Sequence, residues 1–135
     1  MQFHNYKEKV LIIDFGSQVT KLIARRIREL GVYSEIITPQ DLTKVKKFYN
    51  IKGLILSGGP STVTANTFQS VPKNIFEKKI PILGICYGLQ LIAKIFGGKI
   101  KSSKKKREFG RATLYKKNTS LLTKKILNNT SALWM

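Results

Sequence analysis

The sequence predicts an α/β fold, in which a parallel sheet is covered by helices on both faces. Three observations support this prediction. Short apolar runs rich in β-branched residues alternate with amphipathic helical segments, and glycine or proline ends most of them. A sharp Gly-Ile-Cys-Tyr-Gly turn also joins one apolar run directly to a helical one. We therefore expect right-handed crossovers and a ligand site at the carboxyl ends of the strands.

The first third of the chain reads as strand, helix and strand. Residues 10–15 form an apolar run that Gly16 ends, which predicts a buried strand. Residues 17–30 carry apolar side chains at helical spacing and predict an amphipathic helix. A second strand is expected over residues 32–37, before the breaker Pro39.

The middle third contains a weakly predicted helix or loop, a strand, a glycine-rich loop and an irregular connection. Residues 41–49 predict a lysine-rich helix or loop, and residues 51–57 predict a third strand. Gly58-Gly59-Pro60 halts that strand. Residues 61–79 predict an irregular connection, with one or two helical turns near residues 71–78.

The last part of the chain changes character after residue 98. Before it, residues 80–85 predict a strand and residues 87–96 a helix. The remainder predicts a more β-rich segment, with strands at residues 99–102, 109–115 and from 133 to the end of the chain, and a short helix at residues 120–127.

Cys86 is the strongest functional signal in the chain. It sits at the end of an apolar strand, between Gly84 and Gly88, where a helix begins. Glycines suit a reversal so sharp that neighbouring side chains would collide, and such a turn exposes a nucleophile. The helix N-terminus directs free N–H groups and a positive dipole toward the sulfur, an environment that suits an anion. Because the glycines, strand and helix coincide, a catalytic thiol is favoured over a buried core cysteine.

Composition narrows the class of protein. The chain has 135 residues and one cysteine, which predicts a single domain without an internal disulfide, in a reducing compartment such as the cytoplasm. Residues 1–8 predict a polar N-terminal tail rather than a signal peptide. Residues 80–100 are apolar, but proline, glycine, glutamine and lysine interrupt them, so we expect no membrane association.

The formal net charge is +18, from 25 basic and 7 acidic residues, and the densest run is Lys104-Lys105-Lys106-Arg107. Such a run is compatible with phosphate contacts in nucleic acid. Lysines greatly outnumber arginines and few aromatic residues lie among them, which favours a solvated surface. We therefore do not expect a nucleic-acid partner.

Four segments together resemble a known family. They are Asp14-Phe15-Gly16-Ser17-Gln18, Ser57-Gly58-Gly59-Pro60, the Gly-Ile-Cys-Tyr-Gly-Leu-Gln motif at 84–90 and, near the end, Arg107-Glu108-Phe109-Gly110. The chain resembles the class I glutamine amidotransferase domain of GMP synthases over nearly its whole length. The resemblance implies a flavodoxin-like parallel sheet.

The resemblance also implies an activity. In this family a cysteine attacks the side-chain amide of glutamine, ammonia leaves, and water hydrolyses the resulting thioester to glutamate. By resemblance Cys86 is the nucleophile, the N–H groups of Gly59 and Tyr87 form the oxyanion hole, and Gln90 contacts the substrate glutamine. Asp14 is expected to stabilise its loop rather than to take part in the chemistry. No metal or cofactor is expected in this domain, since ATP and Mg belong to the synthetase domain or subunit, the expected partner, which aminates XMP to GMP.

One departure from the family is important. Its catalytic histidine and glutamate lie beyond the tryptophan-methionine pair that matches Trp134-Met135, the end of this sequence. We therefore expect residues 1–135 to be a partial amidotransferase domain, with a sheet incomplete at its C-terminus, no synthetase domain and no independent catalysis, as in a trimmed enzyme or a pseudogene product. The single histidine, His4, precedes the first strand, and a strand of six residues would separate it from Cys86 by about 20 Å. A general base must lie within about 3 Å.

Two other hypotheses remain open. The chain could be a degenerate or regulatory amidotransferase-like subunit that still binds glutamine or a synthetase. It could also be a small basic nucleic-acid-binding protein built on the same fold. We favour the partial enzyme, because a protein released from catalysis would not need the cysteine turn and the Gly58-Gly59 loop.

Overall fold

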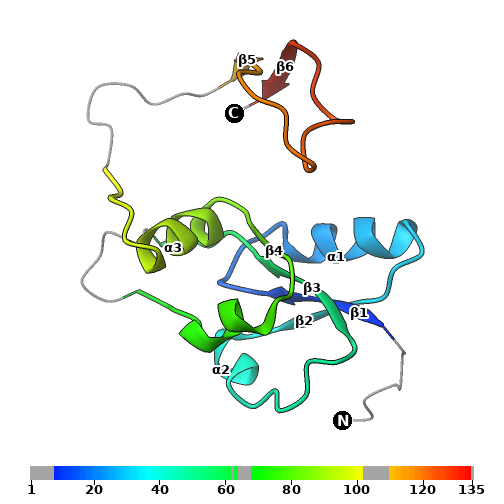
Figure 1. Cartoon of the computed structure of the whole chain (residues 1–135), viewed down its shortest axis with the longest axis vertical. Helices are drawn as coiled ribbons and strands as arrows, with labels where there is room; N and C mark the ends of the chain where they lie inside the picture. Colours follow the sequence, from blue (N-terminus) through cyan, green and yellow to red (C-terminus); the bar gives the residue numbers. More distant parts are fainter. Residues whose placement is uncertain (1–7, 62, 64–67, 102–109, 135) are drawn as a thin grey trace. The chain divides into compact units, whose positions relative to one another are not determined.

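The computed structural model describes residues 8–61, 63, 68–101 and 110–134 of the chain. It divides into two compact units, residues 1–101 and residues 102–135, which are described separately. The first unit contains a four-stranded parallel sheet in the order β2-β1-β3-β4 (Figure 1). Its strands are β1 (Lys9–Ile13), β2 (Ser34–Ile37), β3 (Ile51–Leu56) and β4 (Ile82–Gly84).

The strands form where the sequence predicts them, and all three pairings are parallel. Ile12 in the central strand β1 pairs with Ile36 on one side and Ile55 on the other. Parallel strands buried on both faces are continuously apolar, which explains why β1 and β3 lack a polar alternation. This arrangement confirms the predicted parallel sheet.

Helices cover both faces of the sheet, as predicted. They are α1 (Thr20–Glu29), α2 (Pro39–Leu42), the 3₁₀ helix η1 (Lys73–Lys78) and α3 (Tyr87–Ile95). In Figure 1, α1 and α3 lie on one face, and α2 and η1 lie on the other. The placement of α1 opposite α2 and η1 is expected from right-handed crossovers, because the chain moves from β1 to β2 in one direction and from β2 through β3 to β4 in the other.

The core of the first unit lies between the sheet and these helices. The central strands supply Leu11, Ile13, Leu54 and Leu56, which are almost completely buried. Other elements add Leu42, Ile75 and Leu91 to the same cluster. Burying such side chains stabilises the unit by about 1.5–3 kcal/mol each. The sheet is therefore a rigid platform for the loops at its carboxyl edge.

The second unit is an antiparallel strand pair. Its strands are β5 (Arg111–Tyr115) and β6 (Thr130–Trp134), with Thr113 opposite Ala132. The predicted strand at residues 109–115 is confirmed from residue 111, and residue 109 lies outside the described residues. The last predicted strand begins at Thr130, three residues earlier than expected.

Two local predictions in this part of the chain are wrong. Residues 99–101 form no strand, because Ile100 is the one apolar residue there and has lysine on each side. Residues 120–127 form hydrogen-bonded turns, with Lys124 N–H donating to the Ser120 carbonyl, instead of a helix. Leu121 and Leu122 are exposed, so no apolar packing compensates for the unfavourable nucleation of a short helix.

Candidate active site

Three loops meet at the carboxyl edge of the sheet, around Cys86. The connections that leave β1 and β3 run in opposite directions, which makes the carboxyl end between these two strands a topological switch point. A Cβ atom built on Gly58, after β3, would lie 3.4 Å from Ser17 Oγ, after β1, and 3.6 Å from Cys86 Cβ, after β4. The loops after β1, β3 and β4 are therefore close together at the carboxyl ends of the strands, where the sequence predicts a ligand site.

Cys86 occupies a strained turn between β4 and α3. Its φ of 50° and ψ of −108° are unusual for a residue with a side chain, and its side chain is exposed. Such conformations cost about 1–3 kcal/mol and persist only where the surrounding structure holds them. Here Ile85 N–H donates to the Leu56 carbonyl at 2.9 Å, and Gly88 N–H donates to the Ser57 carbonyl at 3.1 Å. These bonds to the β3 edge fix the turn on both sides of the sulfur.

The glycines that flank Cys86 are required by close packing, as predicted. A Cβ atom on Gly84 would lie 2.7 Å from Leu89 N. A Cβ atom on Gly88 would overlap the carbonyl oxygen of Leu56. The absence of both side chains lets α3 start directly against β3, with Cys86 at the helix N-cap position.

Gly59 and Tyr87, the predicted oxyanion-hole residues, lie on the two loops beside Cys86. Gly59 packs against the backbone of Phe15, where an added Cβ would lie 2.7 Å from the carbonyl oxygen. The main-chain N–H groups of Gly59 and Tyr87 donate to no other group within the described residues. Both amides are therefore available to a ligand.

The Tyr87 side chain anchors the start of α3. It is buried, its ring centroid lies 4.9 Å from that of Phe15, and its hydroxyl donates to the Gln69 carbonyl at 2.6 Å. Burial raises the pKa of the Tyr87 hydroxyl above its ordinary value. The side chain is thus a neutral structural anchor at physiological pH.

The Gln90 side chain is held by the chain that follows the glycine loop. Val63 N–H donates to Gln90 Oε1 at 3.4 Å. One turn further along α3, Lys94 Nζ donates to the Val63 carbonyl at 3.0 Å and lies 4.0 Å from the Phe68 ring centroid. Gln90 therefore positions this connection, and its contact with the substrate stays a prediction.

A buried polar chain that the sequence did not reveal runs beside these loops. Asp14 Oδ1 accepts hydrogen bonds from the N–H groups of Gly16 and Ser17, at 2.9 and 3.2 Å, so Asp14 stabilises its loop as expected. It also accepts from the Thr20 hydroxyl at 2.9 Å, and Thr20 Oγ1 lies 3.1 Å from Ser57 Oγ. One signal was available: Thr20 and Ser57 are polar residues at positions where an apolar helix face and an apolar strand meet the site.

The described residues contain no histidine that could act as a general base beside the thiol. The single histidine, His4, lies outside them, as do Arg107, Glu108 and Phe109 of the family-like segment. The part of the chain that the structure describes also contains no group of three or more His, Cys, Asp or Glu residues that could hold a metal ion.

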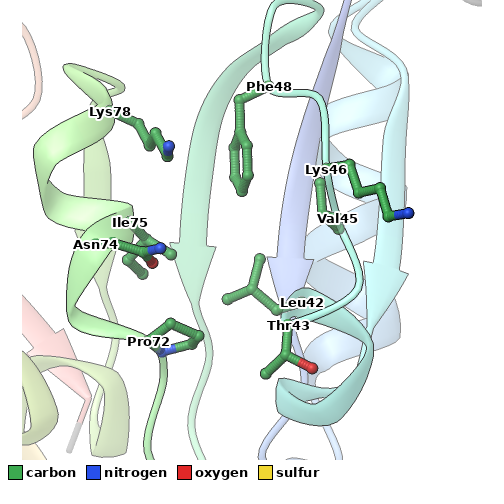
Figure 2. Close-up of a pocket in the computed structure, with 9 residues that line it drawn as sticks. All are labelled: Leu42, Thr43, Val45, Lys46, Phe48, Pro72, Asn74, Ile75 and Lys78. Carbon is green, nitrogen blue, oxygen red and sulfur yellow. The ribbon is translucent and has the colours of Figure 1, made fainter.

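A separate cavity of about 450 Å³ lies between η1 and the connection from α2 to β3 (Figure 2). Figure 2 shows Phe48 and Lys78 on opposite sides of it, and Lys78 Nζ lies 5.6 Å from the Phe48 ring centroid. Its lining includes none of the predicted site residues. This cavity is therefore separate from the candidate site at the carboxyl edge of the sheet.

Within the described residues, no helix has the length and apolar character needed to cross a bilayer. The longest, α1, has 10 residues.

Comparison with known proteins agrees with this geometry. Residues 11–133 match the family model described as "Glutamine amidotransferase class-I". The chain is 50% identical over 113 residues to GMP synthase [glutamine-hydrolyzing] of Borrelia garinii subsp. bavariensis, and 45% identical over 129 residues to that of Ligilactobacillus salivarius. These matches cover 84% and 95% of this chain, but 21% and 25% of the two relatives.

A solved structure gives the same result for the fold. A crystal structure from Thermoplasma acidophilum, described as that of a "putative gmp synthase subunit a protein", superimposes with a TM-score of 0.79 at 30% identity, over 97% of this chain and 65% of that one. This confirms the predicted flavodoxin-like amidotransferase sheet. Because the family model spans nearly the whole sequence, the chain belongs to the class I glutamine amidotransferase family.

Proposed function

We propose that this chain carries the nucleophile and oxyanion-hole part of a glutaminase that supplies ammonia to a GMP synthase reaction. The observation that supports this best is the exposed Cys86 in its strained turn, with the Gly58-Gly59 loop in contact with it. A buried core cysteine would need neither the strain nor the exposure.

The chemistry follows from the position of each group. The Cys86 thiolate would attack the side-chain carbonyl carbon of glutamine, and the carbonyl oxygen would become an oxyanion. The free N–H groups of Gly59 and Tyr87 would stabilise that charge. The C–N bond would then break, ammonia would leave with a proton from a general acid, and water would hydrolyse the Cys86 thioester to glutamate.

The use of the ammonia is inferred from the relatives, of which the chain spans about a quarter or less. They are GMP synthases, so we place the chain with a synthetase domain or subunit that aminates XMP to GMP, using ATP and Mg, in the cytoplasm. The basic surface is then a solvated surface and not a nucleic-acid site. Since the 135 residues contain one histidine, His4, we expect them to require a further general base for turnover.

Covalent labelling tests this proposal without turnover. The probe is 6-chloro-5-oxo-L-norleucine, in which CH₂Cl replaces the amide NH₂ of glutamine. The thiolate sulfur bonds to the chloromethyl carbon, and chloride leaves with the electron pair. We expect one equivalent of label on Cys86 by mass spectrometry, slowed by added glutamine and absent from Cys86→Ala.

The control reagent is chloroacetone, a chloromethyl ketone without the amino-acid part. Labelling by the two reagents at the same rate, with no protection by glutamine, would contradict a glutamine site at Cys86.

A further inference from the structure

We propose that the Ser57 hydroxyl is a positioning group, which sets the orientation of the Gly58-Gly59 peptide and so aims the Gly59 N–H at the oxyanion. Thr20 and Asp14 hold Ser57 from behind. This inference rests on the proposed function and adds to it three polar residues that touch neither the sulfur nor, in this proposal, the substrate.

The first step is the contact itself. Ser57 Oγ donates to the carbonyl oxygen of Gly58 at 3.1 Å, and Ser57 is completely buried. That carbonyl and the N–H of Gly59 belong to the same peptide unit. The described residues contain no cis peptide, and in a trans unit the two groups point in opposite directions. A carbonyl held toward the buried Ser57 hydroxyl therefore turns the Gly59 N–H away from the interior.

The second step is that this peptide needs such a restraint. Glycine lies on both sides of it, so it can rotate about its neighbouring bonds without the penalty that a side chain would impose. The Gly59 N–H donates to no group within the described residues, and so nothing on that side of the peptide holds it. On the other side of the peptide, the hydrogen bond from Ser57 Oγ to the Gly58 carbonyl restrains it.

The third step is what holds the Ser57 hydroxyl. Thr20 Oγ1 lies 3.1 Å from Ser57 Oγ and 2.9 Å from Asp14 Oδ1, and its single proton serves these two acceptors. Thr20 is buried, and Asp14 is fixed by the N–H groups of Gly16 and Ser17. The chain Asp14-Thr20-Ser57 thus ties the loop after β1 to the loop after β3, and leaves the Ser57 proton for the Gly58 carbonyl.

Ser57→Ala tests the proposal, and Ser34→Ala is its matched control. Ser34 is also completely buried and donates to a backbone carbonyl, that of Ala24 at 2.9 Å, but it lies on β2 away from Cys86. The two variants remove the same group from equally buried places. Both variants should lower the melting temperature, Ser57→Ala by more because the Ser57 hydroxyl also accepts from Thr20. A change in the reactivity of Cys86 that only Ser57→Ala shows comes from the position of Ser57.

The reactivity readout is a ratio of two alkylation rates at Cys86, measured on the full chain. 6-Chloro-5-oxo-L-norleucine places a ketone oxygen at the oxyanion position, whereas iodoacetamide reports on the thiolate by simple displacement of iodide. We expect Ser57→Ala to lower the ratio by about tenfold or more, because losing one oxyanion donor slows acyl transfer by about 10²–10³. Ser34→Ala should leave the ratio unchanged. Thr20→Val should lower it and Thr20→Ser should restore it.

A structural readout is independent of the proposed function. The residual dipolar coupling of the Gly59 N–H reports the orientation of the peptide, and we expect it to change in Ser57→Ala but not in Ser34→Ala. An unchanged coupling in Ser57→Ala, or a rate ratio equal to that of Ser34→Ala, would overturn the positioning role. If 6-chloro-5-oxo-L-norleucine labels the wild type no faster than chloroacetone does, the proposed function fails. The residual dipolar coupling of the Gly59 N–H then still decides whether Ser57 orients the peptide.

Discussion

At the scale of single residues, Cys86 occupies a backbone conformation that costs stability. Its positive φ is maintained by hydrogen bonds from Ile85 and Gly88 to the end of β3 and the residue that follows it. These two hydrogen bonds hold Cys86 in the strained conformation, and the cost in free energy can be measured by substituting Cys86.

Replacing Cys86 by glycine should relieve this strain. We expect Cys86→Gly to be about 1 kcal/mol more stable than Cys86→Ala, because glycine adopts positive φ without a steric penalty. Urea unfolding of the two variants measures the difference, and neither retains the sulfur. Equal stability, or a more stable alanine variant, would show that the turn is not strained.

Tyr87 should make stability depend on alkaline pH. Burial raises the pKa of its hydroxyl in the folded state, so the unfolded chain loses this proton first. The stability that the protonated Tyr87 hydroxyl contributes is complete below pH about 10, the ordinary pKa of tyrosine. It is lost as the pH rises through the higher pKa of the folded state. Tyr87→Phe removes the titrating hydroxyl, so the variant should lose less stability between pH 8 and about 11 than the wild type does. It also lacks the hydrogen bond to Gln69, so its stability should be lower at neutral pH.

Unfolding by urea between pH 8 and about 11 measures this effect. Tyr49→Phe is the control, because Tyr49 is exposed and substitution there should leave the wild-type pH dependence intact. A parallel pH dependence for Tyr87→Phe and wild type would refute the assignment to Tyr87.

At the scale of elements, the contact between α3 and β3 positions Cys86, the proposed nucleophile. The helix begins against the Leu56 carbonyl, and Gly88 is the residue that permits this approach. Any side chain at this position displaces the helix N-terminus that carries Cys86.

Gly88→Ala should therefore destabilise the first unit by about 3 kcal/mol, the upper part of the range for overpacked sites. Its Cβ would lie 2.6 Å from Leu56 Cβ. The control is Gly53→Ala on β3, where the nearest atoms would be 3.8 Å away, and we expect a change within about 0.5 kcal/mol. Urea denaturation compares the two, and a similar loss in both would argue against the close approach of α3.

At the scale of the whole molecule, the candidate site combines the exposed thiol of Cys86 with the N–H groups of Gly59 and Tyr87, but the described residues contain no histidine. We expect the isolated 135-residue chain to release no ammonia from glutamine above the level of Cys86→Ala. A coupled glutamate or ammonia assay measures this. Cysteine-dependent ammonia release would contradict it and would show that another group of the chain acts as the base.

Much of this molecule could be predicted from local sequence. The strands around Ile12 and Ile55, the helix after Cys86 and the glycines beside it all follow from periodicity and turn chemistry, which depend on neighbours a few residues apart. The prediction near Leu121 failed because no apolar packing stabilises a short helix there. The prediction at residues 99–101 failed because Ile100 is the one apolar residue of that segment.

The sequence by itself determined the alternation of strands and helices and the turn that holds Cys86, the candidate nucleophile, because both are properties of short segments. Only the tertiary structure decided which polar groups support the site. Thr20 and Ser57 are 37 positions apart and contain no shared motif, yet their hydroxyls lie 3.1 Å apart. The parallel sheet brings them together, since the carboxyl ends of neighbouring strands meet at one edge however far apart they are in the chain.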